Sequence, residues 1–132
     1  MLTEKDYCDY ETCVALRELG YKGISRFFYA TKESPLRRYS YDQILTTRIA
    51  DAVGHTLAIS LFSAQKWLRE EKHLHITIYS YSQESWQYRI TKPHQKLEDG
   101  LHGEDFSSFE EALSEGIKEA VKILKENETI HE

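Results

Sequence analysis

Residues 60–90, SLFSAQKWLREEKHLHITIYSYSQESWQYRI, decide the fold because they carry the most regular pattern in the chain. Ser60 is a good helix N-cap, and apolar residues recur behind it at helical spacing: Leu61, Ala64, Trp67 and Leu68. The runs HITIYSYS and SWQYRITK then alternate with the period of a strand. The stretch predicts a helix followed by an antiparallel hairpin.

The loop between these two strands decides which residues share a face of the hairpin. A three-residue loop, 83–85, pairs Ser82 with Trp86 and Ile78 with Ile90, whereas a two- or four-residue loop joins the tyrosines to Trp86. We expect the three-residue loop, because burying each of these large apolar side chains is worth about 1.5–3 kcal/mol. One face then holds Ile76, Ile78, Trp86, Tyr88 and Ile90, and the other holds Thr77, Tyr79, Tyr81, Gln87 and Arg89.

Helices are predicted at both ends of the chain. The first covers about 4–19, opened by a capping box of Thr3 and Asp6 and closed by Gly20 in a Schellman motif. The last begins at the S-x-x-E box of Ser108 and Glu111 and carries a long apolar stripe. Gly116 lies on that stripe and allows a neighbouring element to approach closely.

Residues 22–58 contain a second hairpin and a segment that the pattern leaves open. Strands near 24–31 and 36–41 flank the turn signal KESP, residues 32–35. Within 42–58, a short helix would suit Ile44, Ile49 and neighbouring apolar residues, and Gly54 would end it. The chain as a whole predicts an α+β fold: a mixed, largely antiparallel sheet of three to four strands with helices packed on one face. We expect a single domain over 1–126 and a frayed tail over 127–132.

The composition is that of an ordinary globular protein. The chain has 132 residues, of which 40% are hydrophobic and 30% charged, and the N-terminus MLTEKDYCDYE does not have the composition of a secretory signal. No apolar run approaches the length of a membrane span. We therefore expect a cytoplasmic protein without a membrane partner. Cys8 and Cys13 lack metal or redox spacing and are expected to be buried.

Charge is unevenly distributed along a chain of net charge −5. Residues 22–48 hold six basic residues against two acidic ones, and residues 98–132 hold three against eleven. Such a dipolar chain can associate with itself or with a charged partner; solvated faces on separate elements explain the same pattern.

Three kinds of site are open to this sequence. The first is a protein-interaction surface made by Tyr79, Tyr81 and Arg89 with the basic hairpin residues Arg26, Arg37 and Arg38, because Tyr and Arg are enriched at the centres of interfaces. The second is a single-stranded nucleic-acid site in 26–41, where cations alternate with aromatic rings.

The third is a metal or acid–base site in the acidic, histidine-containing loop 93–106. The histidines considered as metal ligands are His73, His75 and His102. The sequence contains no Gly-rich phosphate loop, nucleophile elbow, H-E-x-x-H or CxxC motif, so we expect no cofactor, and we expect neither a metal ion nor catalysis. The favoured prediction is a non-catalytic interaction module that binds a protein partner or forms a homodimer.

Three segments also resemble a known group: CVALRELGY, SLFSAQKWLREEKHLHITIYSYSQESWQYRI and FSSFEEALSEGIKEAVKIL. Their order resembles small uncharacterised proteins carried by phage and other mobile elements of gut bacteria, in which a W-L-R-E helix precedes two strands and an S-F-E-E-A-L helix closes the chain. The closing helix is also similar to that of HicB-type antitoxins. The resemblance implies a small α+β accessory protein and carries no catalytic residues to this chain.

Overall fold

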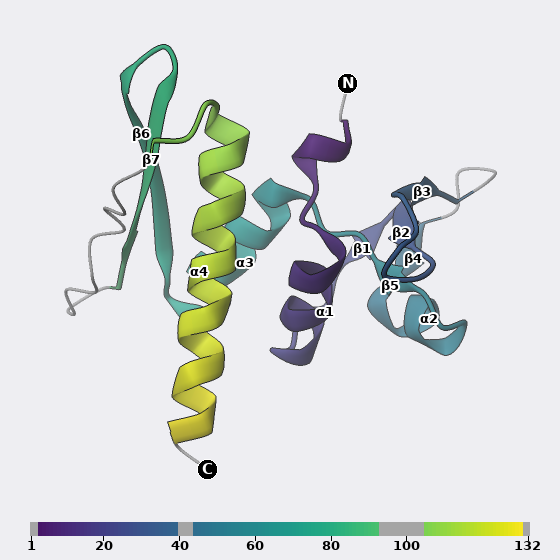
Figure 1. Ribbon diagram of the computed structural model, residues 1–132. Coiled ribbons are helices and arrows are strands. Elements are labelled where there is room, and N and C mark those ends of the chain that lie inside the picture. Colours follow the sequence, from purple (N-terminus) through teal and green to yellow (C-terminus); the bar gives the residue numbers. More distant parts are fainter. Residues whose placement is uncertain (1–2, 40–43, 93–104, 131–132) are drawn as a thin grey trace. The chain divides into compact units, whose positions relative to one another are not determined.

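A computed structural model of the chain describes residues 3–39, 44–92 and 105–130, and it has the α+β fold expected from the sequence (Figure 1). The chain groups into two compact units, Met1–Ser60 and Leu61–Glu132. Its strands pair antiparallel in small sheets of two or three strands. The prediction of a single domain over 1–126 stays a prediction.

The first unit combines short helices with short strands. Its elements are the 3-10 turn η1 (Glu4–Asp6), α1 (Tyr10–Glu18), β1 (Ile24–Ser25), β2 (Phe27–Tyr29), β3 (Arg37–Arg38), β4 (Leu45–Thr46), α2 (Thr47–Ala52) and β5 (Thr56–Leu57). β1 pairs with β4, and β2 lies between β3 and β5. The hairpin predicted around KESP is present, with Phe27 opposite Arg38.

The helix predicted over 4–19 is shorter than expected and begins later. Asp6 accepts a hydrogen bond from the Thr3 backbone N–H at 2.7 Å, as the capping box predicts. The helix that this box begins is, however, only the single 3-10 turn η1. Tyr7 is extended and bridges to Ser60, and the Cys8 N–H donates to the Ile59 carbonyl at 2.8 Å. These pairings hold the chain extended before the helix, so α1 starts at a second cap, Asp9.

The predicted end of α1 is confirmed in detail. Gly20 has φ +108°, the left-handed conformation that a residue with a Cβ rarely adopts. The Tyr21 N–H donates to the Leu16 carbonyl at 2.9 Å, and the Gly20 N–H to the Arg17 carbonyl at 3.0 Å. This is the hydrogen-bond pattern of a Schellman motif.

The segment 42–58 that the sequence left open contains β4, α2 and β5, and residues 42 and 43 lie outside the described residues. Thr46 caps α2 by accepting from the Ile49 N–H at 3.2 Å. Gly54, at φ +78°, follows the end of the helix as predicted. The short helix expected there is therefore present, but it is flanked by strands.

Cys8 and Cys13 lie in the core of the first unit, as expected. The Cys8 carbonyl accepts from the Tyr29 hydroxyl at 2.7 Å and from the Cys13 thiol at 3.6 Å. The Ile59 N–H in turn donates to Cys13 Sγ at 3.4 Å. These bonds tie α1, β2 and the chain after β5 together around two buried thiols, and burial raises the pKa of the Tyr29 hydroxyl well above its ordinary value.

The second unit is built from α3 (Leu61–Lys72), β6 (His75–Ser82), β7 (Ser85–Thr91) and α4 (Phe109–Ile130). α4 runs along the β6–β7 hairpin (Figure 1), and α3 contacts both α4 and β6. The Gln65 side chain donates to the Ile76 carbonyl at 2.8 Å, which fixes α3 at the edge of β6. Ser108 caps α4 by accepting from the Glu111 N–H at 3.1 Å, as predicted. α4 continues into the segment 127–132 that was expected to fray, and residues 131 and 132 lie outside the described residues.

The hairpin register differs from the expected one by two residues and keeps the predicted faces. Ile76 lies opposite Ile90 and Tyr79 opposite Gln87, whereas Ser82 pairs with Ser85 across a two-residue turn. A β-bulge between Ser80 and Ser82 compensates for the shorter turn. Because that extra residue restores the parity, Tyr79 stays on the face opposite the isoleucines.

The closest approach in the second unit is at Gly116 of α4. A Cβ at this position would lie 2.9 Å from Ile76 Cγ2 and 3.2 Å from Tyr88 Cβ. Ile76, Tyr88 and Ile90 are all buried beneath the helix. The glycine therefore lets α4 lie directly on the hairpin, which is the close approach of a neighbouring element that the sequence predicts at this position.

Replacing Gly116 with alanine is expected to lower the free energy of unfolding by up to about 2 kcal/mol net, because over-packing costs about 1–3 kcal/mol and alanine's helix propensity returns about 1 kcal/mol. Urea unfolding measures the change. A double-mutant cycle combines this change with Ile76→Ala, which removes the contacted methyl group. The double variant should lose less unfolding free energy than the sum of the losses in the two single variants. Additive losses would mean that the contact at Ile76 does not limit the approach of α4.

Tyr88 makes the same packing sensitive to alkaline pH. Burial, followed by the nearby Glu119 and Glu115, raises the pKa of Tyr88 from 10.0 to about 12. In the unfolded chain the phenol loses its proton near 10, so folding stability is fully present below that pH and falls as the pH rises from 10 toward 12. The Tyr88→Phe variant should show a shallower fall in urea-unfolding free energy over this interval; an unchanged slope would contradict the assignment.

Candidate interaction surface

The candidate surface of the second unit is the face of the β6–β7 hairpin that points away from α4. We call it the outer face; it is formed by Thr77, Tyr79, Gln87 and Arg89. Arg89 lies opposite Thr77 and reaches diagonally over the ring of Tyr79, with its guanidinium carbon 5.4 Å from the ring centroid. Thr77 and Arg89 are exposed, and Tyr79 is half-buried.

The contact between Arg89 and Tyr79 is a cation–π interaction, worth about 0.5–1 kcal/mol at an exposed site. It orders the long arginine side chain, so less conformational entropy remains to be lost when a partner binds. The pair presents a planar cation beside an aromatic ring. A guanidinium group can stack on a partner's ring and donate hydrogen bonds to it, and the tyrosine ring can also stack, so the pair is suited to bind a partner.

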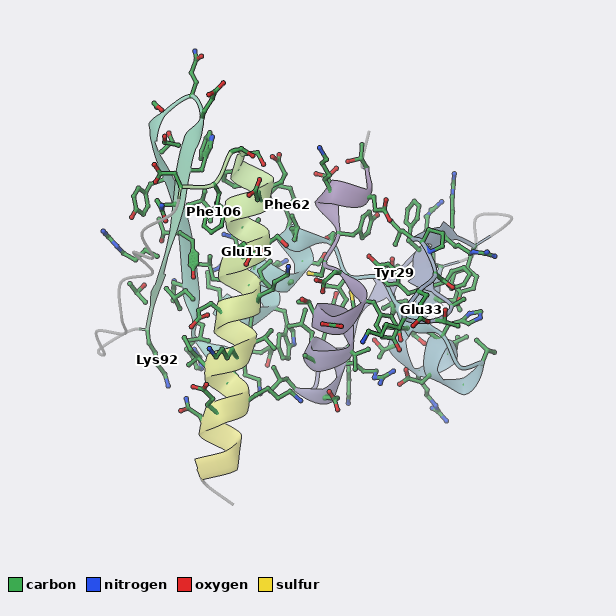
Figure 2. All side chains as sticks on the ribbon, viewed as in Figure 1. Tyr29, Glu33, Phe62, Lys92, Phe106 and Glu115 are labelled. Atoms are coloured by element: carbon green, nitrogen blue, oxygen red, sulfur yellow. The ribbon has the colours of Figure 1, made fainter. Side chains whose placement is uncertain are left out.

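Gln87 is not at the surface, although the strand pattern predicts a face that tolerates water. Its side chain is 3% exposed, and its Nε2 donates to Asp105 Oδ1 at 2.7 Å. The chain before α4 pairs with the edge of β7, because Trp86 and Phe106 exchange two backbone hydrogen bonds of 2.9 Å. Phe106, labelled in Figure 2, stacks on Tyr88 with ring centroids 6.0 Å apart.

This pairing reduces the available outer face to the Thr77, Tyr79 and Arg89 side chains. Tyr81, which the sequence places on the same face, forms the extra residue of the bulge. Its side chain lies outside the described part of the structure.

The basic residues predicted for the surface all belong to the first unit. Arg37 and Arg38 are exposed on β3, and Arg26 is exposed on the bend between β1 and β2. The Arg26 carbonyl accepts from the Tyr39 N–H at 2.9 Å, which holds the hairpin closed beside the arginines. Tyr79 and Arg89 belong to the second unit, so the predicted surface is divided between the two units.

The aromatic rings next to these arginines are engaged with one another. Phe28 is buried and stacks on Tyr39 at 4.1 Å and on His55 at 4.4 Å between ring centroids. The Tyr39 hydroxyl and His55 Nδ1 form a hydrogen bond of 2.9 Å, and burial raises the pKa of Tyr39. Phe27 packs on Tyr7 at 5.2 Å. These rings stabilise the first unit, and its arginines are among the exposed groups of the segment.

His73 and His75, the described residues considered for metal binding, do not belong to a cluster of metal-binding side chains within the described ranges. His73 is exposed at φ 58°, directly after α3, where the Leu74 N–H donates to the Leu68 carbonyl at 3.0 Å. His75 pairs with Thr91 at the start of β6. In the described ranges, no three His, Cys, Asp or Glu side chains gather where they could hold a metal ion. His102 and the rest of 93–104 lie outside those ranges.

The sequence did not reveal the exposed aliphatic side chains of the first unit. Four large aliphatic residues there are well exposed: Ile24, Ile44, Ile49 and Val53. Ile44 and Ile49 were expected to suit a short helix, but α2 begins at Thr47, has six residues and buries Ala50 alone among them. The signal that could have found them is the shortness of the helix, since Gly54 ends it after a turn and a half.

No helix in the described part of the chain has the length and apolar composition needed to cross a membrane. Comparison of the chain with protein-family models, with curated proteins and with solved structures finds no match.

The hydrogen bond between Gln87 and Asp105 should stabilise the chain segment that covers β7. Asp105→Ala leaves the buried Gln87 amide without this acceptor, and the expected cost is about 1–3 kcal/mol in unfolding free energy. The matched variant Glu70→Ala removes an exposed carboxylate of α3 and should leave the stability within about 0.5 kcal/mol of wild type. Equal effects of the two substitutions in urea unfolding would show that the Gln87 contact adds nothing.

Proposed function

We propose that the protein is a non-catalytic protein-interaction module that self-associates through the outer face of the β6–β7 hairpin. The observation that carries the proposal is the ordered Tyr79–Arg89 pair on the hairpin face opposite α4. Tyrosine and arginine are the residue types that most often dominate binding energy at protein interfaces. An accessory role of this kind is also what the resemblance to mobile-element proteins implies.

Self-association is supported by the chemistry of the pair. Arg89 carries a charge and Tyr79 offers an aromatic face, so two copies related by a two-fold axis can each place the guanidinium against the other's ring. The uneven charge of the chain, basic over 22–48 and acidic over 98–132, adds an attraction between copies. Exposed Thr77 beside the pair leaves room for a close approach.

The charge-reversal variant Arg89→Glu tests this proposal, because Arg89 is exposed and its replacement should leave the fold intact. We expect the wild-type chain to sediment as a concentration-dependent dimer and the variant to show a dimer dissociation constant raised about tenfold or more, the loss typical of an interface hot spot. Sedimentation velocity over a range of concentrations measures both.

Lys92→Glu is the matched control, since it makes the same charge change at an exposed residue just beyond β7. It should dimerise almost as wild type. Tyr79→Ser should raise the dimer dissociation constant independently of Arg89. Thermal unfolding of this variant checks that loss of the half-buried ring has not unfolded the chain. A wild-type chain that stays monomeric, or equal weakening by Arg89→Glu and Lys92→Glu, would contradict self-association through this face.

A further inference from the structure

An open groove of about 1070 Å³ lies in the first unit between the end of α1 and α2. Its walls come from Arg17 and from residues in the segments 20–24 and 46–52. We call it the α1–α2 groove. Its size is at the upper limit of small-molecule sites, which typically measure about 300–1,000 Å³, and therefore suits a longer ligand.

The walls of the groove are fixed by contacts within the first unit. The Gly23 N–H donates to Thr47 Oγ1 and the Thr47 N–H to the Gly23 carbonyl, both at 3.3 Å. Arg17 bridges α1 to α2 through a 2.9 Å ion pair with Asp51. A Cβ at Gly23 would collide with the ring of Tyr21, which is buried. The groove is thus held open by two hydrogen bonds, an ion pair and a close aromatic contact.

The side chains that face the groove are aliphatic to an unusual degree for a surface. Ile24 is 65% exposed and Ile49 is 50% exposed, and both line the groove together with Ala52. Ile24 lies opposite Thr46, so it projects on the same side of the short β1–β4 sheet as that residue. Clustered exposed aliphatic residues around a concave surface are a mark of a binding site.

The rim of the groove is basic in a chain that is acidic overall. Arg17, Lys22 and Arg48 line it against one acidic residue, Asp51, which is already paired with Arg17. Lys22 and Arg48 are exposed. The groove is therefore complementary to a ligand that combines aliphatic side chains with carboxylates at its flanks. A basic ligand matches the groove less well, because the groove is itself basic. A nucleic acid that binds by stacking on aromatic rings also matches it less well, because the exposed apolar groups of the groove are aliphatic.

We propose that the α1–α2 groove binds a short segment of a partner protein in which aliphatic residues are flanked by Asp or Glu. The aliphatic side chains lie on Ile24 and Ile49, and the acidic flanks face Lys22 and Arg48. This site does not depend on self-association through the outer face, and each can fail without the other.

Selection of random dodecapeptides displayed on phage against the full chain tests the proposal. We expect the recovered peptides to be enriched in aliphatic and acidic residues together. Fluorescence anisotropy with the leading labelled peptide should then show binding that weakens about tenfold or more in Ile49→Glu and in the double variant Lys22→Glu/Arg48→Glu. Binding should also weaken with added salt.

Matched controls separate the groove from general surface effects. Val53→Glu adds the same charge at an exposed aliphatic residue that directly follows α2 and does not line the groove, and Arg37→Glu reverses an exposed charge outside it. Both should bind the peptide like wild type, as should Arg89→Glu. Circular dichroism checks that every variant is folded.

Several results would overturn the proposal. One such result is that every recovered peptide also binds the Ile49→Glu variant. Another is that the recovered peptides are basic or uncharged. Weakened dimerisation in Ile49→Glu would make a second copy the occupant. Binding of a single-stranded oligonucleotide or of anionic lipid vesicles that Ile49→Glu abolishes would assign the groove to one of those ligands instead.

Discussion

The close approach of α4 to the β6–β7 hairpin at Gly116 is the constraint on which the second unit depends. A two-stranded sheet is marginal in water unless one of its faces is covered. Because Gly116 has no side chain, the helix backbone comes near enough to Ile76 and Tyr88 for both to be buried. Trp86 then packs edge-on against Phe109 at the start of the helix, with ring centroids 5.8 Å apart. Covering this face leaves the opposite face, with Tyr79 and Arg89, for other contacts.

That division of faces could be predicted from the sequence, whereas the register could not. Hydrophobicity distinguishes odd from even shifts of a strand, because an odd shift moves every side chain to the other face, but it barely distinguishes shifts by two. The turn proved to be two residues long, and the bulge before Ser82 restores the parity. Turn length and bulge are set by local backbone energy around Tyr81, and an alternating pattern carries little information about it.

Contacts between residues distant in sequence explain the other differences. The Thr3–Asp6 box was recognised correctly, but Tyr7 and Cys8 pair with Ser60 and Ile59, more than fifty residues away, and the helix starts only after them. Gln87 was expected at the surface, yet it is covered by Asp105 from a loop whose course the pattern did not define. Signals confined to a few residues predict the structure correctly: the Schellman motif at Gly20, the cap at Ser108 and the small residue at 116.

The two units also bury their apolar residues differently, and this difference shapes the surfaces they offer. A long amphipathic helix such as α4 buries its apolar residues against both the hairpin and α3, so Phe62 is the large hydrophobic residue that stays well exposed among the described residues of that unit. α2 is too short to do the same: with six residues and one buried position, it leaves Ile49 at the surface, and β1 leaves Ile24 there. An exposed aliphatic side chain costs stability unless something covers it part of the time. The first unit therefore presents an aliphatic, basic-rimmed groove and the second an arginine–tyrosine face, so the two proposed sites differ in chemistry.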